Sequence, residues 1–469
     1  MPSIEARPKP ELHPEFCKGC GRCIEACSVH HCIAEGRDIH AQSGLVPVAF
    51  HPDGCNGCNL CVEACPEPYA LMAGDAAGPE EHPVVSRHRA PAPQTVPDER
   101  VAFAEGKTLV VKGAHAAAIG ALLAGCRHFF GYPITPSTEG AELMAKLLPR
   151  LGGTFLQAVS EVAAVNMMYG CGGGGKPCMT FTSSPGFSLM LEGVSYLIGS
   201  EIPGVIVNVM RAGPGLGNIG PAQADIKLTC RGLGHGATHA VALAPSTPQE
   251  MLDHAMLAFE LSFKYRNPVV ILADGYLGQM TGRVRLPGAL VKPGLPAWAV
   301  SGDAAHRKNV HTSIYLNEAD QEAHDEHILA KYAAMTEAEQ RADLYRCEDA
   351  EVLLVACNTP ARMAKGAVRA LRDEGVAAGL FRPQTIWPFP AKVLVPLLPR
   401  VRRLVVVEAS EGQLEDELRL ALSHAGAGQA IPIDHVRRQG GNLPSQREIL
   451  EGVRGPRAPR ATARKVVTA

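Results

Sequence analysis

A chain of 469 residues, 46% of them hydrophobic, is long enough to form two or three domains with separate cores. Its 45 basic and 47 acidic residues give a net charge of −2, which argues against nucleic acid as the main partner. No apolar run approaches the ~20 residues that span a bilayer, and no apolar segment follows the first charges, so we predict a cytoplasmic protein without a secretory signal or a membrane partner.

The amino-terminal segment concentrates the cysteines, with nine of the 15 lying between Cys17 and Cys65. A cytoplasmic protein uses such a density for metal or redox chemistry rather than for disulfides. Two runs with the spacing C-x2-C-x2-C-x3-C occur at residues 17–27 and 55–65, and Pro66 follows the second. This run is typical of paired [4Fe–4S] clusters, so residues 1–73 resemble a bacterial two-cluster ferredoxin with an α+β fold.

The spacing also predicts which thiolates share a cluster. Three closely spaced thiolates wrap three corners of a cubane, and the fourth reaches the other cluster. We expect one cluster on Cys17, Cys20, Cys23 and Cys65, and the other on Cys27, Cys55, Cys58 and Cys61. Structural zinc is disfavoured because zinc sites use cysteine pairs with a longer gap. Ser28 stands where a proline is usual, which removes no ligand, and Cys32 is interpreted as a buried or spare thiol.

The next part of the chain alternates between strand and helix patterns after a Pro-rich polar connector at 74–106. TLVVKG at 108–113 predicts a buried strand, and a helix is expected at 114–126. Further expected elements are strands at 127–132, 178–182, 205–209 and 269–273 and a helix at 248–263. This alternation over 107–286 predicts a parallel sheet covered on both faces.

The carboxyl-terminal third predicts a second, smaller α/β domain over 350–453. A polar connecting segment at 287–349 precedes it, with one helix expected in 318–342. The expected elements of the small domain are strands at 352–357 and 404–408 and a helix at 360–373 that stops at Gly375. Residues 454–469 carry five basic and no acidic residues with two prolines, which predicts a disordered tail.

A glycine run at 215–220 spells G-x-G-x-x-G. A dinucleotide site would also need a helix opening at the third glycine and an acid about 20 residues further on. Pro221 follows at once instead, and the next acids, Asp225 and Glu250, are too near and too far. The run is therefore a weak sign of a nicotinamide site, and Gly172–Gly175 is interpreted as a helix-to-strand turn.

The segment GYPITPST at 131–138 lies where a parallel strand is expected to end and a helix to begin, the usual place for a ligand in open α/β sheets. Pro136 suits the first helical turn, with Thr135 as the cap before it. The Thr135 hydroxyl would then lie near free backbone N–H groups that suit a carboxylate or carbonyl oxygen. The residues alone leave a capped helix start and a ligand site equally open.

This segment and five others resemble the α subunit of thiamine diphosphate-dependent 2-oxoacid:ferredoxin oxidoreductases. The others are SEVAAVNMMYG, SSPGFSLMLEG, VNVMRAGPGLGNIGPAQAD, YRNPVVILADGYLGQM and FRPQTIWPFP, and the resemblance runs from about 108 to 452. It implies a pyrimidine-binding-type domain at 107–286 and a transketolase C-terminal-like domain at 350–453. The head resembles the family's ferredoxin-type (δ) subunit, so the chain looks like a fusion of two pieces.

The resemblance also implies roles for individual residues. Thr135 would hydrogen-bond the 2-oxoacid group of the substrate, and Arg211 would bind its carboxylate as a fork donor. Glu161 would bond the aminopyrimidine ring nitrogen of thiamine and drive formation of its ylide, with Pro133 and Ile134 against the cofactor. Without the resemblance, Glu161 is an ordinary helix-start acid. Arg211 could be a surface arginine, although its place at the carboxyl end of a strand favours the site.

An absence in the sequence points to partner subunits. The family anchors thiamine diphosphate through Mg²⁺ with a GDG segment and a later asparagine, whereas this chain has only ADGYLG at 273–278. The resemblance therefore implies a β subunit that holds the diphosphate, a γ subunit, and a ferredoxin or another electron carrier. In the implied reaction CO₂ leaves the 2-oxoacid, coenzyme A takes the acyl group, and electrons pass through the two clusters.

The segment RAGPGLG at 211–217 resembles the branched-chain (2-oxoisovalerate) members of the family more than the 2-oxoglutarate members, which show serine and threonine after the proline. No second arginine for a distal carboxylate follows nearby. We expect a branched-chain or aryl 2-oxoacid as substrate. The alternatives are 2-oxoglutarate, pyruvate, a non-catalytic electron-transfer adapter, and a self-sufficient nicotinamide-dependent dehydrogenase.

Overall fold

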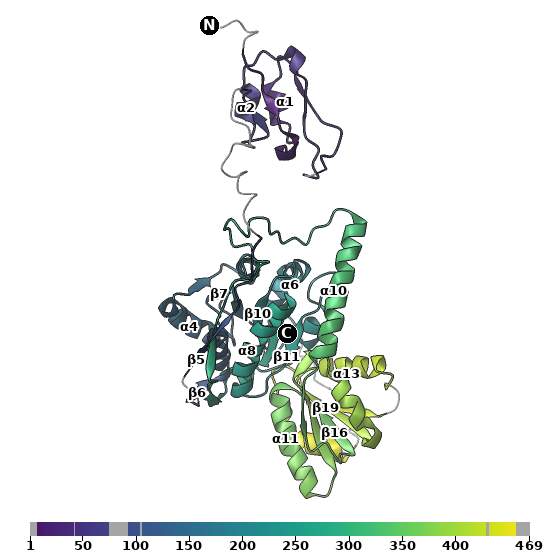
Figure 1. Cartoon of the computed structure of the whole chain (residues 1–469). Coiled ribbons are helices and arrows are strands. Elements are labelled where there is room, and N and C mark those ends of the chain that lie inside the picture. The colour runs from purple at the N-terminus through teal and green to yellow at the C-terminus, as the bar shows by residue number, and fades with distance from the viewer. Residues whose placement is uncertain (1–6, 42, 75–91, 104–105, 428–430, 456–469) are drawn as a thin grey trace, which may run out of the picture. The chain divides into compact units, whose positions relative to one another are not determined.

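The computed structural model describes residues 7–41, 43–74, 92–103, 106–427 and 431–455. The chain divides into two compact units, residues 1–92 and 93–469, which are described separately (Figure 1). Most of the tail expected at 454–469 and most of the first half of the expected connector lie outside the described residues. No helix among the described residues is both long and apolar enough to cross a membrane.

The first unit is a small α+β fold with an internal repeat. Each half has a one-turn 3-10 helix followed by a short α-helix that carries the third cysteine of its run. The helices are α1 (Arg22–Ala26) and α2 (Leu60–Ala64), and the antiparallel strand pairs are β1 (Glu11–Leu12) with β4 (Leu71–Met72) and β2 (Ile33–Ala34) with β3 (Ala49–Phe50). This is the ferredoxin-like arrangement that the cysteine repeat predicts.

The centre of the second unit is a seven-stranded sheet with the order β18-β11-β12-β10-β9-β7-β8. All neighbours in it are parallel except the edge pair β11 and β18. Every residue of β9, β10 and β12 is buried, which explains why these strands read as continuous apolar runs. The bounds are β7 (His128–Gly131), β8 (Thr154–Gln157), β9 (Cys178–Thr182), β10 (Gly204–Met210), β11 (Val241–Leu243), β12 (Pro268–Asp274) and β18 (Thr385–Trp387).

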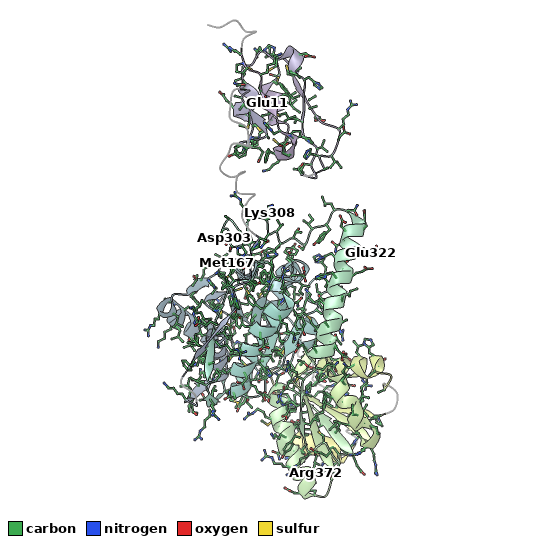
Figure 2. The ribbon with its side chains drawn as sticks, viewed as in Figure 1. Glu11, Met167, Asp303, Lys308, Glu322 and Arg372 are labelled. Atoms are coloured by element: carbon green, nitrogen blue, oxygen red, sulfur yellow. The ribbon has the colours of Figure 1, made fainter. Side chains whose placement is uncertain are left out.

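Helices cover both faces of this sheet, as the strand–helix alternation predicts (Figure 1). α3 packs on α8, and α5 packs on α6. The bounds are α3 (Gly113–Leu123), α4 (Thr138–Leu147), α5 (Glu161–Gly173), α6 (Ser184–Gly199), α7 (Ile226–Arg231), α8 (Pro248–Tyr265) and α9 (Gly275–Gln279). The long helix α10 (Glu318–Ala338) follows, with Glu322 on its outer face (Figure 2).

The smaller domain has a five-stranded sheet with the order β15-β17-β16-β19-β20, parallel except at the β15 edge. Its strands are β15 (Ala342–Tyr345), β16 (Val352–Val355), β17 (Ala378–Pro383), β19 (Arg403–Glu408) and β20 (Ile433–Arg437). Its helices are α11 (Asn358–Asp373), α12 (Ala391–Leu394), α13 (Gln413–His424) and α14 (Gln446–Arg454). The apolar side chains of the central strands form the core of each of the two α/β domains.

Buried polar contacts join the two domains at the carboxyl end of β12. The Asn358 side chain donates to the carbonyl oxygens of Pro245 and Leu272 at 3.0 and 2.7 Å. The Thr359 backbone N–H and hydroxyl both donate to the Asp274 carboxylate at 2.8 Å. Asp274 is fully buried and also caps α9. Four donated hydrogen bonds therefore compensate the burial of this carboxylate at the junction.

The expected buried strand at 108–113 is a strand, but its burial was predicted wrongly. β6 (Thr108–Lys112) pairs antiparallel with β13 (Thr281–Arg285) outside the main sheet, and Val110 is 68% exposed. A two-stranded ribbon leaves one of its faces open, so an apolar composition does not imply burial there.

Two expected boundaries also differ from the structure. β5 (Glu99–Ala102), inside the expected connector, pairs antiparallel with β14 (Ala289–Lys292) in the expected connecting segment, so residues from 93 onward belong to the larger unit. The small-domain sheet already begins at β15, before residue 350. Short edge strands of mixed polarity lack the apolar run by which the central strands are found.

Candidate functional site

Three loops meet at the carboxyl edge of the main sheet. They follow the adjacent parallel strands β7, β9 and β10 and begin at Tyr132, Ser183 and Arg211. Because the strands are parallel neighbours, their carboxyl ends lie side by side, which is where ligands bind in such sheets. The amino-terminus of α6, at Ser184, enters the same edge.

The loop after β7 differs from its predicted form. α4 begins at Thr138 with Ser137 at the N-cap position, so Pro136 is not in the helix and Thr135 is not its cap. The Ser137 backbone N–H and hydroxyl both donate to the Ile134 carbonyl at 3.0 and 2.7 Å. Thr135 and Pro136 belong to this turn, so the helix begins after them rather than at Pro136. Pro133 and Thr135 are exposed at the edge, and Ile134 is half-buried.

Arg211 lies against that loop and is 7% exposed. Its Nη1 donates to the Thr135 carbonyl at 2.9 Å, and its Nη2 donates to the Leu216 carbonyl at 3.3 Å. The Nε atom is buried and has no hydrogen-bond partner among the described residues. A guanidinium has five N–H donors, so three remain after these two bonds. The structure thus brings Arg211 and Thr135 together and leaves donors for a further acceptor.

Ser184 fixes the backbone of Arg211. The Arg211 N–H donates to the Ser184 hydroxyl at 3.1 Å, and that hydroxyl donates to the Asp225 carboxylate at 2.5 Å. Asn208 donates to the same carboxylate at 2.9 Å. Burial raises the pKa of Asp225, and these two hydrogen bonds oppose the rise. The adjacent Ser183 hydroxyl is buried without a partner among the described residues.

Glu161 is the first residue of α5, after Ser160, whose hydroxyl caps the helix by accepting from the Ala163 N–H at 3.3 Å. Its side chain is 5% exposed. A Cβ atom at Gly186 would lie 2.3 Å from the Glu161 Oε1 atom and 2.5 Å from the Thr182 hydroxyl oxygen. The carboxylate therefore lies against bare backbone in the first turn of α6, where only glycine fits.

The loop after Arg211 contains the glycine run and is attached to the small domain. Its backbone closes on itself, because the Asn218 N–H donates to the Ala212 carbonyl at 3.1 Å. The Asn218 side chain donates to the Gly440 carbonyl at 3.0 Å and accepts from the Gly220 N–H at 2.8 Å. The next helix opens only at Ile226, so the strand–glycine loop–helix arrangement of a dinucleotide site is not formed at this run.

A cleft of about 480 Å³ lies beside these residues, between the two α/β domains. The large domain contributes Ser184, Asp225 and the backbone at 212–215, and the small domain contributes Glu411 and Gln439. The described residues that line it include no lysine or arginine. The cleft therefore has mixed walls of polar and small apolar residues, with acidic but no basic side chains.

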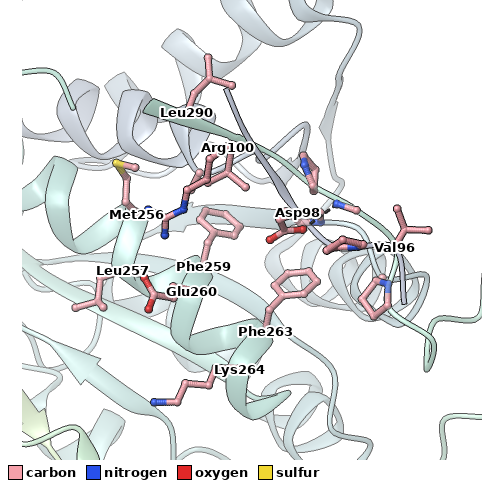
Figure 3. A pocket seen from close by; sticks show the side chains of 18 of the residues that line it. Val96, Asp98, Arg100, Met256, Leu257, Phe259, Glu260, Phe263, Lys264 and Leu290 are labelled. Carbon is pink, nitrogen blue, oxygen red and sulfur yellow. Dashed lines mark hydrogen bonds between the residues drawn. The ribbon is translucent and has the colours of Figure 1, made fainter. Parts of the chain in front are cut away.

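A separate cavity of about 730 Å³ lies between α8 and the strand pair β5 and β14 (Figure 3). Met256, Phe259 and Phe263 of α8 line it with apolar side chains, and Arg100 of β5 and Asp98, the residue before β5, also line it. No residue of the candidate site lines this cavity. Its size alone does not connect it with the chemistry at the sheet edge.

In the head, the predicted cluster thiols gather in two sets. A cavity of about 140 Å³ is lined by four of them, Cys27, Cys55, Cys58 and Cys61. Burial, followed by the neighbouring thiols Cys27, Cys55 and Cys58, raises the pKa of Cys61 to about 11. Neighbouring thiols that raise one another's pKa suit a cationic iron–sulfur core, because its positive charge would lower those pKa values.

The second set surrounds Cys23. Burial, followed by the thiols of Cys65, Cys17 and Cys20, raises the pKa of Cys23 to about 11. The backbone N–H groups of Gly19 and Val48 point at the Cys17 sulfur from 3.4 and 3.5 Å. Such N–H donors stabilise ligand thiolates. Both sets therefore bring together thiols that the spacing assigns to one cluster, and their roles as cluster ligands stay a prediction.

Cys32 is 2% exposed and lines the same cavity as Cys27 and Cys55. Its backbone N–H lies 3.3 Å from the Cys27 sulfur, and its own thiol lies 3.4 Å from the His30 carbonyl. It is a buried thiol beside one ligand set, as interpreted from the sequence.

We expect Cys58→Ala to remove one cluster from the intact complex. The iron bound to this chain should fall from about eight atoms to about four, because a cubane with three thiolates and no replacement ligand is lost. Cys58 suits the test because it is exposed. The spare thiol of Cys32 interacts with Cys27 and Cys55, so it is not placed to replace Cys58 as a ligand. Iron and sulfide analysis gives the result. The matched control, Cys32→Ser, should keep about eight iron atoms, and full iron content in Cys58→Ala would contradict the assignment.

Sequence reasoning missed three residues that hold the predicted site residues in place. Ser184 and Asp225 position the backbone of Arg211, and Gly186 packs against Glu161. The signal for two of them is present, since SSPG directly after a buried strand is typical of a helix start at the ligand edge. Asp225 carries no local signal, because its contacts with Ser184 and Asn208 come from other elements.

With this geometry in place, the chain can be compared with known proteins. Residues 119–346 match the family profile described as pyruvate flavodoxin/ferredoxin oxidoreductase, thiamine diphosphate-binding. Residues 350–449 match core domain II of pyruvate:ferredoxin oxidoreductase, and residues 14–29 and 52–73 match a 4Fe–4S binding domain. Ketoisovalerate oxidoreductase subunit VorB of Methanothermobacter marburgensis is 46% identical over 349 residues, covering 74% of this chain and 97% of that protein.

The chain belongs to the 2-oxoacid:ferredoxin oxidoreductase family. 2-Oxoglutarate synthase subunit KorA of Methanocaldococcus jannaschii is 33% identical over 374 residues, covering 74% of this chain and 100% of that protein. A solved structure of 2-oxoglutarate:ferredoxin oxidoreductase from Magnetococcus marinus shares the fold, with a TM-score of 0.66 at 24% identity over 74% of this chain and 65% of that chain.

Membership in the family confirms the predicted family, the predicted fold class and the expectation of an oxidoreductase subunit with thiamine diphosphate and 4Fe–4S domains. The relatives are named as subunits, so this oxidoreductase subunit works with partner subunits. The family is matched over both α/β domains, and the head is matched separately as a cluster domain.

Proposed function

We propose that this oxidoreductase subunit is the α subunit, with a fused two-cluster head, of an enzyme that oxidises a branched-chain 2-oxoacid to its acyl-coenzyme A. The observation that carries the proposal is the convergence of Thr135, Arg211 and Glu161 on the carboxyl edge of one parallel sheet. Arg211 touches the Thr135 loop directly, and the first turn of α6 lies between Arg211 and Glu161.

When bound, thiamine diphosphate supplies a carbanion that attacks the 2-oxo carbon and an electron sink that lets CO₂ leave. Glu161 would share a proton with the ring nitrogen of the aminopyrimidine: its carboxyl group would donate the proton to that nitrogen, and the resulting carboxylate would then accept the hydrogen bond. Its burial against Gly186 keeps water from competing for the carboxylate. Pro133 and Ile134 provide the apolar contact beside it.

The substrate contacts come from the other two loops. Two of the three remaining N–H donors of Arg211 bind the carboxylate of the 2-oxoacid as a fork. The exposed Thr135 hydroxyl donates to the 2-oxo group. Because the Arg211 guanidinium is already held by two carbonyl oxygens, little further ordering is needed when the substrate binds.

The exposed apolar side chains around this edge support a partner subunit there. Val159, Leu216 and Ile219 are 88%, 81% and 62% exposed, and Leu189 and Tyr276 are at least half exposed. Apolar patches of this kind mark protein interfaces. We propose that a β subunit with a GDG segment and Mg²⁺ binds the diphosphate and covers the edge, and that a γ subunit and a ferredoxin-type carrier complete the complex. A cytoplasmic location fits the 15 cysteines, which are all described and all free.

The proposed substrate class rests on the walls of the cleft beside Arg211. The described lining residues offer no cation for a second carboxylate, whereas Asp225 and Glu411 would repel one. This favours a 2-oxoacid with an apolar side chain over 2-oxoglutarate. The relative named ketoisovalerate oxidoreductase is also more similar than the one named 2-oxoglutarate synthase, at 46% against 33% identity.

The test is an anaerobic assay of the purified complex with coenzyme A and a viologen dye. We expect kcat/KM for 2-oxoisovalerate to exceed the values for 2-oxoglutarate and pyruvate by roughly 10- to 200-fold, the range that pocket contacts can supply. The chain without its partners should show no turnover. A preference for 2-oxoglutarate would overturn the substrate class, and an inactive complete complex would favour the adapter role.

A further inference from the structure

A second group of thiols lies at the opposite edge of the main sheet, away from the candidate site. His128 is the first residue of β7, and Cys178 is the first residue of β9, so both mark the amino ends of their strands. Cys171 is in the last turn of α5, and Cys126 lies two residues before His128. These residues belong neither to the cluster head nor to the carboxyl edge.

The four residues lie close together: His128 and Cys178 are direct partners in β7 and β9, and the Cys178 thiol donates to the Met168 carbonyl at 3.6 Å, one turn before Cys171 on α5. The Cys171 thiol lies 3.9 Å from the Lys176 carbonyl and interacts electrostatically with the Cys178 and His128 side chains. The His128 Nδ1 atom lies 3.3 Å from the Pro177 carbonyl, which holds the ring in place. The Cys126 thiol donates to the His128 carbonyl at 3.3 Å, so its proton is committed to the backbone. Cys171 is thus the thiol with both a thiol and an imidazole as partners.

Burial separates the roles of the three thiols. Cys126 and Cys178 are fully buried, whereas Cys171 is only partly buried and can meet a small molecule from solvent. The arrangement therefore places a partly exposed thiol, Cys171, near the buried thiol Cys178, with the His128 imidazole beside Cys171. Attacking and resolving thiols in redox proteins are arranged in this way.

Electrostatics support the same division. Hydrogen bonding from Cys178, and then the hydrogen bond and charge of His128 and the charge of Lys176, lower the pKa of Cys171 to about 6 against the effect of burial. Its interaction with Cys171 and its burial raise the pKa of Cys178 well above the usual value. The hydrogen bond to Cys171 raises the pKa of His128. Near pH 7, Cys171 is the thiolate and Cys178 the thiol.

We propose that Cys171 and Cys178 form a redox-active dithiol that small hydroperoxides oxidise to a disulfide. The Cys171 thiolate attacks the terminal peroxide oxygen, the O–O bond breaks, and the leaving alkoxide takes a proton from the His128 imidazolium. This gives Cys171 sulfenic acid and an alcohol. The Cys178 thiol then attacks the sulfenic sulfur, the S–S bond forms, and water leaves. Two thiols of a small reductant restore the pair by exchange.

Peptide mapping of the intact complex tests this proposal without relying on catalytic activity. The complex is prepared anaerobically, treated at pH 7 with one equivalent of tert-butyl hydroperoxide, denatured and alkylated with iodoacetamide. We expect Cys171 and Cys178 to escape alkylation and to appear as a disulfide that is two hydrogens lighter. Dithiothreitol should restore alkylation of both residues.

Cys230 is the internal control in the same digest, because it is fully buried and its pKa is raised well above the usual value. Cys171 should be oxidised more than about tenfold faster than Cys230, in line with its thiolate fraction. In Cys178→Ser the sulfenic acid on Cys171 should persist and be trapped by dimedone, whereas Cys171→Ser should give no dimedone adduct on either of these peptides.

Two results would overturn the proposal. One is oxidation of Cys171 no faster than that of Cys230. The other is a disulfide that joins Cys171 to a residue other than Cys178, such as Cys126. Cys126→Ser should leave the Cys171–Cys178 disulfide intact, and its loss in that variant would also count against the assigned pair. Because the readout is a peptide mass, neither result depends on the substrate or partners proposed above.

Discussion

Glu161→Gln should lower kcat of the assembled complex by roughly 10²- to 10⁴-fold, the range that a positioned acid–base group contributes. The glutamine side chain has nearly the same shape and fits the space against Gly186, but its amide cannot hold the proton that the carboxylate holds. KM for the 2-oxoacid should change little, because Glu161 is not one of the proposed substrate contacts. The measurement is the initial rate of viologen reduction with 2-oxoisovalerate and coenzyme A.

Two further variants separate the chemical role of Glu161 from a structural one. Glu142→Gln changes an exposed acid on α4 and should leave kcat within about twofold, as surface substitutions usually do. Gly186→Ala keeps the carboxylate but adds a methyl group 2.3 Å from it, and should also reduce kcat strongly. Full turnover in Glu161→Gln, with the cofactor bound, would remove Glu161 from the mechanism.

The second large effect is expected from Arg211→Ala, which should lower kcat/KM by roughly 10- to 150-fold. A hydrogen bond to a charged group contributes about 1.5–3 kcal/mol, and the substrate carboxylate loses its cationic partner. Arg211→Lys should recover only part of this loss, because an ammonium cannot bind a carboxylate as a fork. Most of the change should appear in KM, since the arginine contacts the substrate before as well as during the reaction.

Arg211 also holds the loops at Thr135 and Leu216, so its variants need a matched arginine control that leaves those loops unchanged. Arg231→Lys offers one, because Arg231 is bonded to Glu417 and lies on α7 rather than at the open edge. It should leave kcat/KM nearly unchanged. Unchanged kcat/KM in Arg211→Ala would show that the carboxylate is bound elsewhere.

The sequence allowed much of the fold to be predicted, for identifiable reasons. Strands buried on both faces must be apolar throughout, so β9, β10 and β12 were located within two residues. The cysteine spacing is a local constraint, and it grouped the two thiol sets that surround Cys23 and Cys61. Edge strands such as β5 and β15 escaped prediction because they obey no such constraint.

The candidate site was predictable only in part. The convergence of the Thr135 and Arg211 loops follows from the rule that parallel strands end at one edge. The start of α4 could not be predicted in the same way. The two hydrogen bonds from Ser137 to the Ile134 carbonyl form a turn where the helix was expected to begin. The fit of Glu161 against Gly186 is a contact between two helices, and no pattern within either segment encodes it.

The loop attached to Gly440 has a consequence for how substrate preference can change. Arg211 bonds to Leu216 in this loop, and Asn218, two residues further, is held by a carbonyl 222 positions away in the sequence. The small domain contributes neither Glu161, Thr135 nor Arg211, yet its turn at 439–441 limits where the guanidinium can lie. Substitutions in that turn could therefore retune the choice of 2-oxoacid while every residue that touches the substrate stays the same.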